Sequence, residues 1–424
     1  MSRHRQRIGF LATAGIAAVI IAGTTGVVAQ DKVAFDLYDL HTTDPGLTFI
    51  KDVTAKWMAD HPNVQVNITT LENEALKDKI AAEMQSGNPP DLFQSWGGGV
   101  LSQQVAAGMA QPIDAAIADI ADTINPGAMS LFQSGGKQYG LPYNFGLVGF
   151  WYNKDLFGQA GITAPPTTWA EYLADVQKLK DAGITPISIG AGDKWPAMFW
   201  WAYLALRIGG KDAMDHAIST GDWSGDAFVK AGEELKKLVD LDPFQAGALA
   251  ATHDESQGVF GNGKAAMELQ GQWAAGAQRS QSESGNGIGD ALGWFSFPVV
   301  DGGAGVITDV FGGGDGYAVG RDAPPEAVEF LKYLVSPEVA NAWAALNDGT
   351  LPPTNGAEAY VTDAGLKEVL AKRAEATFAQ LYLDQATTPA LGGAINDAVA
   401  GLVAGALSPQ DVTKAITDAA AAAQ

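Results

Sequence analysis

The chain has 424 residues, enough to form two sizeable cores. Hydrophobic residues make up 47% and charged residues only 17%, which is typical of a folded chain rather than a disordered acidic one. The formal net charge of −22 opposes binding to phosphate backbones or anionic lipid heads. Because the chain has no cysteine, disulfides, thiolate metal sites and cysteine nucleophiles are excluded.

The first 29 residues predict a cleaved export signal. Three arginines, at positions 3, 5 and 7, precede an apolar stretch over 9–21, and Val27-Val28-Ala29 is a small-residue cleavage signal. The mature chain is expected to begin at Gln30 and to be periplasmic or secreted. It has no cysteine to carry a lipid anchor. The alternative is an uncleaved membrane anchor, and no other stretch is apolar enough to span a bilayer.

Residues 33–99 alternate between strand and helix patterns. Apolar residues alternate over 33–37 and 64–68, recur at helical spacing over 47–58 and 76–84, and form a short run at 92–93. This βαβαβ order predicts a parallel sheet with helices on its faces. Ligands of such sheets bind at the carboxyl ends of the strands, where we expect the loops 38–44, 71–73 and 95–99.

A run of about ten nearly uncharged residues, 141–152, follows a turn at Lys137–Gly140 and predicts a strand buried on both faces. We interpret it as the crossing between two lobes. The alternative is an ordinary core strand of one large domain. Beyond it, Thr168 and Glu171 form a capping box, 184–189 predicts a strand and 198–207 an aromatic helix, so the second lobe is also α/β.

Several catalytic patterns are missing. No two of the five histidines have the i, i+4 spacing of a helical metal site, and no G-x-S-x-G elbow occurs. Gly258–Lys264 resembles the start of a phosphate loop, but Ala265 stands where a magnesium-binding Ser or Thr is needed. Acidic pairs are so frequent that a glycosidase-type pair is neither indicated nor excluded. No metal and no cofactor is expected.

The eleven tryptophans suggest a different chemistry. An aromatic face covers the C–H face of a sugar ring, while carboxylates and amides bind its hydroxyls. Trp96, Trp195 and Trp273 lie in turns rich in Gly, Pro or amides, which favours a role in ligand binding. Core packing is the interpretation for Trp57, Trp169, Trp223, Trp294 and Trp343. The polar candidates beside these aromatic residues and loops are Glu72, Asn144, Asp193, Gln272 and Asp315.

Four motifs together carry a family resemblance: Gly87–Leu92, Tyr139–Tyr143, Trp151–Phe157 and Phe260–Trp273. With them the chain resembles the extracellular solute-binding proteins of carbohydrate ABC importers, the maltose-binding-like class. Within that class, Gln94–Gly99 and Gln380–Gln385 look most like members that bind xylobiose and xylo-oligosaccharides.

The resemblance implies an α/β, two-lobe periplasmic-binding-protein fold (type II-like) with the ligand cleft between lobes joined by hinge strands. The first lobe would comprise 30–143 plus about 301–350, and the second 144–300 plus about 351–424. A monomer would capture an oligosaccharide, without catalysis, and deliver it to permease subunits at the membrane. The ligand-binding residues would be His41, Glu72, Ser95, Trp96, Gly97, Asn144, Asp193, Trp195, Trp273, Gly314 and Asp315.

Two other functions are weighed against this one. A secreted carbohydrate-active enzyme would use an acidic pair in the same cleft. A peptide receptor would need a positive charge for the terminal carboxylate, and the candidate loops contain only Lys194.

Overall fold

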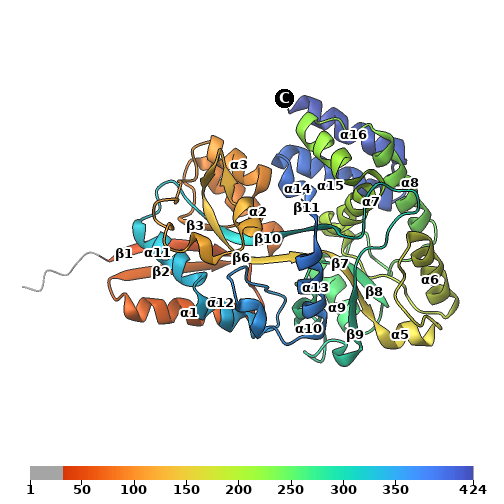
Figure 1. Ribbon diagram of the computed structural model, residues 1–424, viewed down its shortest axis with the longest axis horizontal. Helices are drawn as coiled ribbons and strands as arrows, with labels where there is room; N and C mark the ends of the chain where they lie inside the picture. The colour runs from red at the N-terminus through yellow and green to blue at the C-terminus, as the bar shows by residue number, and fades with distance from the viewer. Residues whose placement is uncertain (1–31, 424) are drawn as a thin grey trace, which may run out of the picture.

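The computed structural model describes residues 32–423, so the predicted export signal lies outside the described part of the chain. Two lobes lie side by side, with β6 (Gly140–Leu147) and β10 (Asp309–Val319) passing between them (Figure 1). This arrangement confirms the predicted two-lobe α/β fold. Within residues 32–423, no helix has the length and apolar character needed to cross a membrane.

The first lobe is built on a six-stranded sheet whose main path runs β11-β10-β3-β1-β2, with β6 paired to β10. β1 is parallel to β2 and β3, as the alternating pattern predicted, whereas β10 is antiparallel to β3 and β6. The strands are β1 Val33–Asp39, β2 Val64–Thr70, β3 Leu92–Ser95, β6 Gly140–Leu147, β10 Asp309–Val319 and β11 Phe378–Leu381. A small hairpin joins β4 Gln133–Ser134 to β5 Lys137–Gln138.

Helices cover this sheet because each buries an apolar face against it. In α2, for example, Leu76 and Ile80 are buried, the Glu72 side chain caps the first turn, and Gly87 ends the helix with φ of 80°. Trp57 and Trp343 are buried in the same lobe, as predicted. The helices are α1 Gly46–Asp60, α2 Asn73–Ser86, α3 Gly98–Ala106, α4 Pro126–Leu131, α11 Pro325–Leu334 and α12 Pro337–Ala344.

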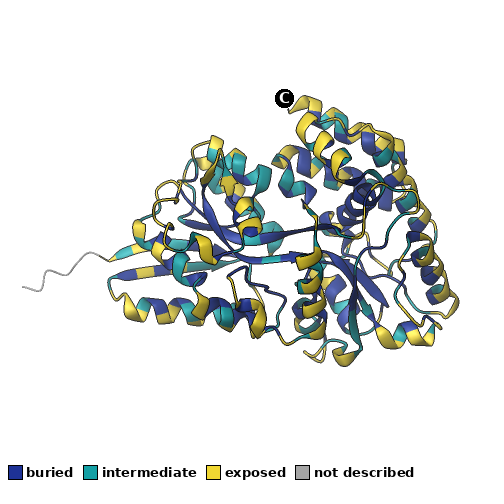
Figure 2. Ribbon diagram, in the orientation of Figure 1, coloured by how far each residue is buried: buried dark blue, intermediate teal, exposed yellow. Residues whose placement is uncertain are grey.

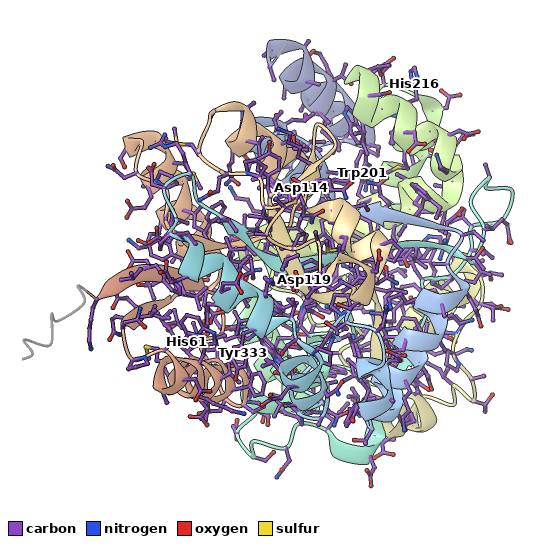
Figure 3. The ribbon with its side chains drawn as sticks, turned by 60° about the vertical axis from the view of Figure 1, so that its left-hand side comes forward. His61, Asp114, Asp119, Trp201, His216 and Tyr333 are labelled. Atoms are coloured by element: carbon purple, nitrogen blue, oxygen red, sulfur yellow. The ribbon has the colours of Figure 1, made fainter. Side chains whose placement is uncertain are left out.

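The second lobe is mostly helical around a three-stranded antiparallel sheet, β8-β7-β9. Its core surrounds α7, where Trp200 and Trp201 are fully buried. Figure 2 colours the ribbon by burial, and Figure 3 labels Trp201. The strands are β7 Gly149–Asn153, β8 Met267–Gln270 and β9 Leu292–Phe295. The helices are α5 Lys154–Gln159, α6 Trp169–Asp181, α7 Trp195–Thr220, α8 Asp226–Val239, α9 His253–Gly261, α10 Ala274–Ser280, α13 Ala364–Glu375, α14 Leu383–Ala386, α15 Pro389–Val403 and α16 Pro409–Ala422.

One predicted strand of this lobe is wrong. Residues 184–189 form no strand, and only Ile187 makes isolated bridges, to Phe244 and Met267. Pro186 has no N–H to donate, so a regular hydrogen-bond ladder cannot continue through the segment. The capping box at Thr168 and Glu171 is present as predicted, at the start of α6.

The predicted crossing is divided into two strands around Val148. β6 pairs with β10 in the first sheet, while β7 pairs with β8 and β9 in the second. Between them, the Val148 N–H donates to the Phe311 carbonyl on β10 at 2.8 Å. One continuous segment thus joins the two sheets, with β10 antiparallel beside it. The exact lobe boundaries stay a prediction.

A buried arginine fixes the segment that leads into β10. Arg207 on α7 is fully buried, and its guanidinium donates to the carbonyls of Phe297, Pro298, Val306 and Asp309 at 2.6–3.3 Å. No carboxylate among residues 32–423 forms an ion pair with it. The backbone therefore supplies the compensation that a buried cation needs, and it anchors the start of β10 to the second lobe.

Candidate functional site

A cavity of about 340 Å³ is lined by residues of both lobes. Loops at the carboxyl ends of β1, β2 and β3 contribute from the first lobe, and the starts of α7, α9 and α10 contribute from the second. This is the edge at which parallel sheets bind ligands. Eight of the predicted site residues line it: His41, Glu72, Trp96, Asn144, Asp193, Trp195, Trp273 and Asp315.

The other three predicted residues do not line the cavity. The Ser95 hydroxyl accepts the Gly97 N–H at 3.0 Å, so it shapes the turn that presents Trp96. Gly97 has φ of 74°, and a Cβ there would lie 2.1 Å from the Leu131 carbonyl oxygen. A Cβ on Gly314, which lies within the β6–β10 ladder, would be 2.8 Å from the Asn144 carbonyl oxygen. These three residues support the site rather than face it.

His41 is held at the cavity wall by a buried carboxylate. Its Nδ1 lies 2.8 Å from Asp39 Oδ1, which also accepts the Tyr317 hydroxyl. Burial is the largest single influence and opposes charge on both partners, but the ion pair and its hydrogen bonds together outweigh it, so the pKa of Asp39 is lowered and the pKa of His41 is raised. Asp39 therefore balances the charge that a protonated His41 carries.

Asp315 lies at the junction of the lobes. Its Oδ2 accepts from Asn144 Nδ2 at 2.7 Å, while Asn144 Oδ1 accepts the Leu351 N–H at 2.7 Å. Burial raises the pKa of Asp315 to about 6, although hydrogen bonds from Asn144 and Trp96 and the charge of His41 lower it. A carboxylate in this position is a strong acceptor for a ligand hydroxyl.

Aromatic rings form the second-lobe wall. The Trp195 ring centroid lies 5.0 Å from that of Phe199 and 6.1 Å from that of Trp273, and Trp273 lies 6.1 Å from Tyr382. Trp273 Nε1 donates to Gln270 Oε1 at 3.1 Å. Gln272, predicted to be a polar partner in the site, is instead fully buried away from the cavity.

Carboxylates line the cavity beside these rings. The Glu72 side chain caps α2 from the first lobe, and Asp193 Oδ2 accepts the His253 N–H at 2.6 Å in the second. Lys77 Nζ lies 3.1 Å from Glu74 and 3.8 Å from Asp384.

These charges influence one another across the cavity. Burial and the charges of Glu72 and Glu255 raise the pKa of Asp193, and burial with the charges of Glu72 and Asp193 raises the pKa of Asp254. Burial lowers the pKa of His253 to about 4, so this imidazole is neutral near pH 7.

The family model described as bacterial extracellular solute-binding protein matches residues 41–341. The chain belongs to this family. That finding confirms the recognition made from the four motifs, at the level of an extracellular solute-binding protein.

Relatives of this solute-binding protein include an uncharacterized ABC transporter extracellular-binding protein of Pyrococcus horikoshii. It is 26% identical over 72% of this chain and 68% of its own length. A probable sugar-binding periplasmic protein of Rhizobium meliloti is 24% identical over 98% of this chain and 99% of its own length.

Two solved structures are similar to this solute-binding protein over most of its length. One, from work on xylan utilization by the thermophilic bacterium Caldanaerobius polysaccharolyticus, has a TM-score of 0.86 and 28% identity, covering 91% of this chain and 99% of its own. A chitin oligosaccharide binding protein has a TM-score of 0.84 and 26% identity, covering 93% of this chain and 99% of its own.

Several lining residues of this solute-binding protein were missed from the sequence. They include Lys77, Tyr143, His253, Asp348 and Asp384. The turn signal Asn347-Asp348-Gly349 marks one of them, and position 253 follows the helix cap at Thr252. Lys77 carries no signal of its own, because it looks like any exposed lysine on a helix.

Two histidines of the solute-binding protein, His41 and His253, line the cavity, and two others lie away from it. His61 follows the C-terminal end of α1 and His216 lies on α7 at the other side of the molecule (Figure 3). Across the described range 32–423, no three His, Cys, Asp or Glu side chains are grouped to hold a metal ion.

Proposed function

We propose that this solute-binding protein captures an oligosaccharide, xylobiose or a xylo-oligosaccharide, by closure of its lobes and delivers it to the permease of an ABC importer. The observation that carries the proposal is one cavity, lined by both lobes, in which aromatic rings face carboxylate and amide groups. We further propose that it acts as a monomer outside the cytoplasmic membrane, after removal of residues 1–29 and without a lipid anchor.

The lining supplies what a sugar needs. Trp195, Trp273 and Tyr382 offer aromatic faces for C–H groups, while Asn144 and Asp315 offer acceptors for hydroxyls. The cavity volume of about 340 Å³ is at the lower end of the range for small-molecule sites, roughly 300–1,000 Å³, which favours a short oligosaccharide over a polymer.

The relatives support the same ligand class. A full-length relative is named a probable sugar-binding periplasmic protein, and one structural neighbour is a chitin oligosaccharide binding protein. The choice of xylose units is supported by the neighbour from work on xylan utilization, together with the motifs Gln94–Gly99 and Gln380–Gln385.

A thermal-shift screen with xylobiose, xylotriose, chitobiose and maltose tests the proposal, followed by titration calorimetry. A true ligand at about 100 times its Kd adds about 2.7 kcal/mol to the free energy of unfolding. If no saccharide raises the melting temperature, the proposed function is wrong; if only chitobiose or maltose does, the xylose assignment is wrong. Incubation with xylobiose for hours should leave it intact, since release of xylose would support the enzyme alternative.

A further inference from the structure

The cavity has an unbalanced charge. Among the described residues that line it, Lys77 is the only Lys or Arg, and its ammonium is already within 4 Å of Glu74 and Asp384. The charge of His41 is matched by Asp39. The lining carboxylates are Asp44, Glu72, Asp193, Asp254, Asp315, Asp348 and Asp384. The lining therefore offers no uncommitted cation to an anionic ligand.

Three of these carboxylates, Glu72, Asp193 and Asp254, define what we call the acidic end of the cavity. Glu72 belongs to the first lobe, and Asp193 is tied to the first turn of α9 through the N–H of His253. Burial and the charge of Glu72 raise the pKa of both second-lobe members, while the His253 N–H and the charge of Lys77 lower that of Asp193. The three groups therefore lie close enough for their charges to interact across the cavity.

An aromatic ring lies beside this end. Trp195 lines the cavity and is only 8% exposed. Its ring lies 5.0 Å from the ring of His253, whose backbone N–H holds Asp193. The acidic end therefore places carboxylates, which accept from hydroxyls, beside an aromatic ring, which covers the C–H groups of a sugar.

The charge of the acidic end restricts the ligand groups that it can bind. Ionised carboxylates only accept hydrogen bonds, whereas a sugar hydroxyl both accepts and donates. A hydroxyl can donate to Asp193 or Glu72. A carboxylate on the ligand has no proton to donate, and the carboxylates of the acidic end would repel it.

We propose that the cavity selects its ligand by charge: it takes neutral oligosaccharides and rejects those that place a uronic acid at the end formed by Glu72, Asp193 and Asp254. The inference rests on the proposed function and deepens it. For xylan fragments it means that unsubstituted or neutrally substituted chains are ligands and glucuronosyl-substituted ones are not.

Calorimetry with three matched probes tests the proposal on the wild-type protein. They are xylotriose, xylotriose carrying one arabinosyl group and xylotriose carrying one glucuronosyl group, so that the arabinosyl form controls for the bulk of a branch. The glucuronosyl form should bind about tenfold more weakly than the arabinosyl form, because its carboxylate meets the like charges of the acidic end. That ratio should shrink as salt is raised, because salt screens the partly exposed charges.

A pair of variants separates charge from shape. In D193N/D254N the preference for the arabinosyl over the glucuronosyl form should fall by about fivefold or more, since two like charges are removed. The control D212N/E233Q removes two exposed charges from α7 and α8, outside the cavity lining, and should leave the ratio unchanged. If the two branched probes bind with affinities within about threefold of each other, the charge-selection inference is wrong, while the proposed function still stands. If no neutral probe binds, the proposed function and the inference fail together.

Discussion

Asp315→Asn should increase the stability of the unliganded protein at neutral pH while weakening sugar binding. The pKa of Asp315 rises in the folded chain from 3.8 to about 6, chiefly through burial. A raised carboxyl pKa means that the folded chain holds the proton more tightly than the unfolded chain does. The cost of ionisation is therefore absent below about pH 4, grows as the pH rises, and is complete above about pH 6.

The size of the effect follows from the same values. The rise in pKa from 3.8 to about 6 lowers the free energy of unfolding by about 3 kcal/mol once the pH is above about 6. Asparagine has no ionisation cost, and its carbonyl can still accept from Asn144 Nδ2. The gain in stability from the substitution should therefore be about 2 kcal/mol larger near pH 7.5 than near pH 4. Loss of a charged acceptor should weaken sugar binding by roughly tenfold or more at pH 7.5.

Urea unfolding of wild type and Asp315→Asn at both pH values measures the difference directly. Asp411→Asn is a control of opposite sign, because hydrogen bonds from Ser408 lower the pKa of Asp411. Its carboxylate stabilises the folded chain above its unfolded pKa, so Asp411→Asn should lose stability at neutral pH and lose less in acid. An Asp315→Asn effect that is the same at both pH values within about 0.5 kcal/mol would refute the reasoning.

Four further substitutions and a scattering measurement test the rest of the structure. Trp273→Ala and Trp195→Ala should each weaken sugar binding by about 2–4 kcal/mol in calorimetry. Trp195→Ala should in addition lower the melting temperature, because its ring is more buried. Unchanged affinity in both variants would show that the aromatic wall is not part of the site. Gly146→Val should destabilise the fold by about 1–3 kcal/mol in urea, because a Cβ there would lie 2.1 Å from Gln272 Oε1. Adding Gln272→Ala should relieve that clash, and a double variant no more stable than Gly146→Val would count against it. Arg207→Met should lower the free energy of unfolding by about 4 kcal/mol or more in urea, since four buried carbonyls lose their donor. A decrease below about 1 kcal/mol would show that these contacts are dispensable. Small-angle scattering should show a smaller radius of gyration when sugar is added, and no change at saturation would contradict closure of the lobes.

The first lobe was predictable because local pattern and tertiary environment agree there. Val33, Phe35 and Leu37 alternate on a strand that has one covered face, and the polar loop after it reaches the carboxyl edge of a parallel sheet. The position of His41 in the cavity follows from that rule alone. The crossing at 141–152 was equally clear, since a strand that enters two sheets has no solvent face and carries almost no charge.

The parts that failed depend on neighbours distant in sequence. Gln272 was placed in the site because it precedes Trp273, yet Glu268, Gln270 and Gln272 alternate on one buried side of the chain. Lys77 and Asp384 meet only because α2 and the four-residue helix α14 are brought together by the fold. The local spacing of residues does not indicate which side chains from distant segments come into contact. The charge balance of the cavity therefore could not be predicted from the sequence.

The antiparallel pair of β6 and β10 determines how the lobes can move. A two-stranded ribbon bends readily out of its plane, whereas sliding one strand along the other would break the ladder hydrogen bonds. Bending of this pair is therefore the motion that the proposed closure of the lobes would use. Asp315 lies opposite Asn144 within that ribbon. Their carboxylate–amide contact would then stay near the axis of the motion, so a sugar bound there would be covered by the aromatic wall as the lobes close.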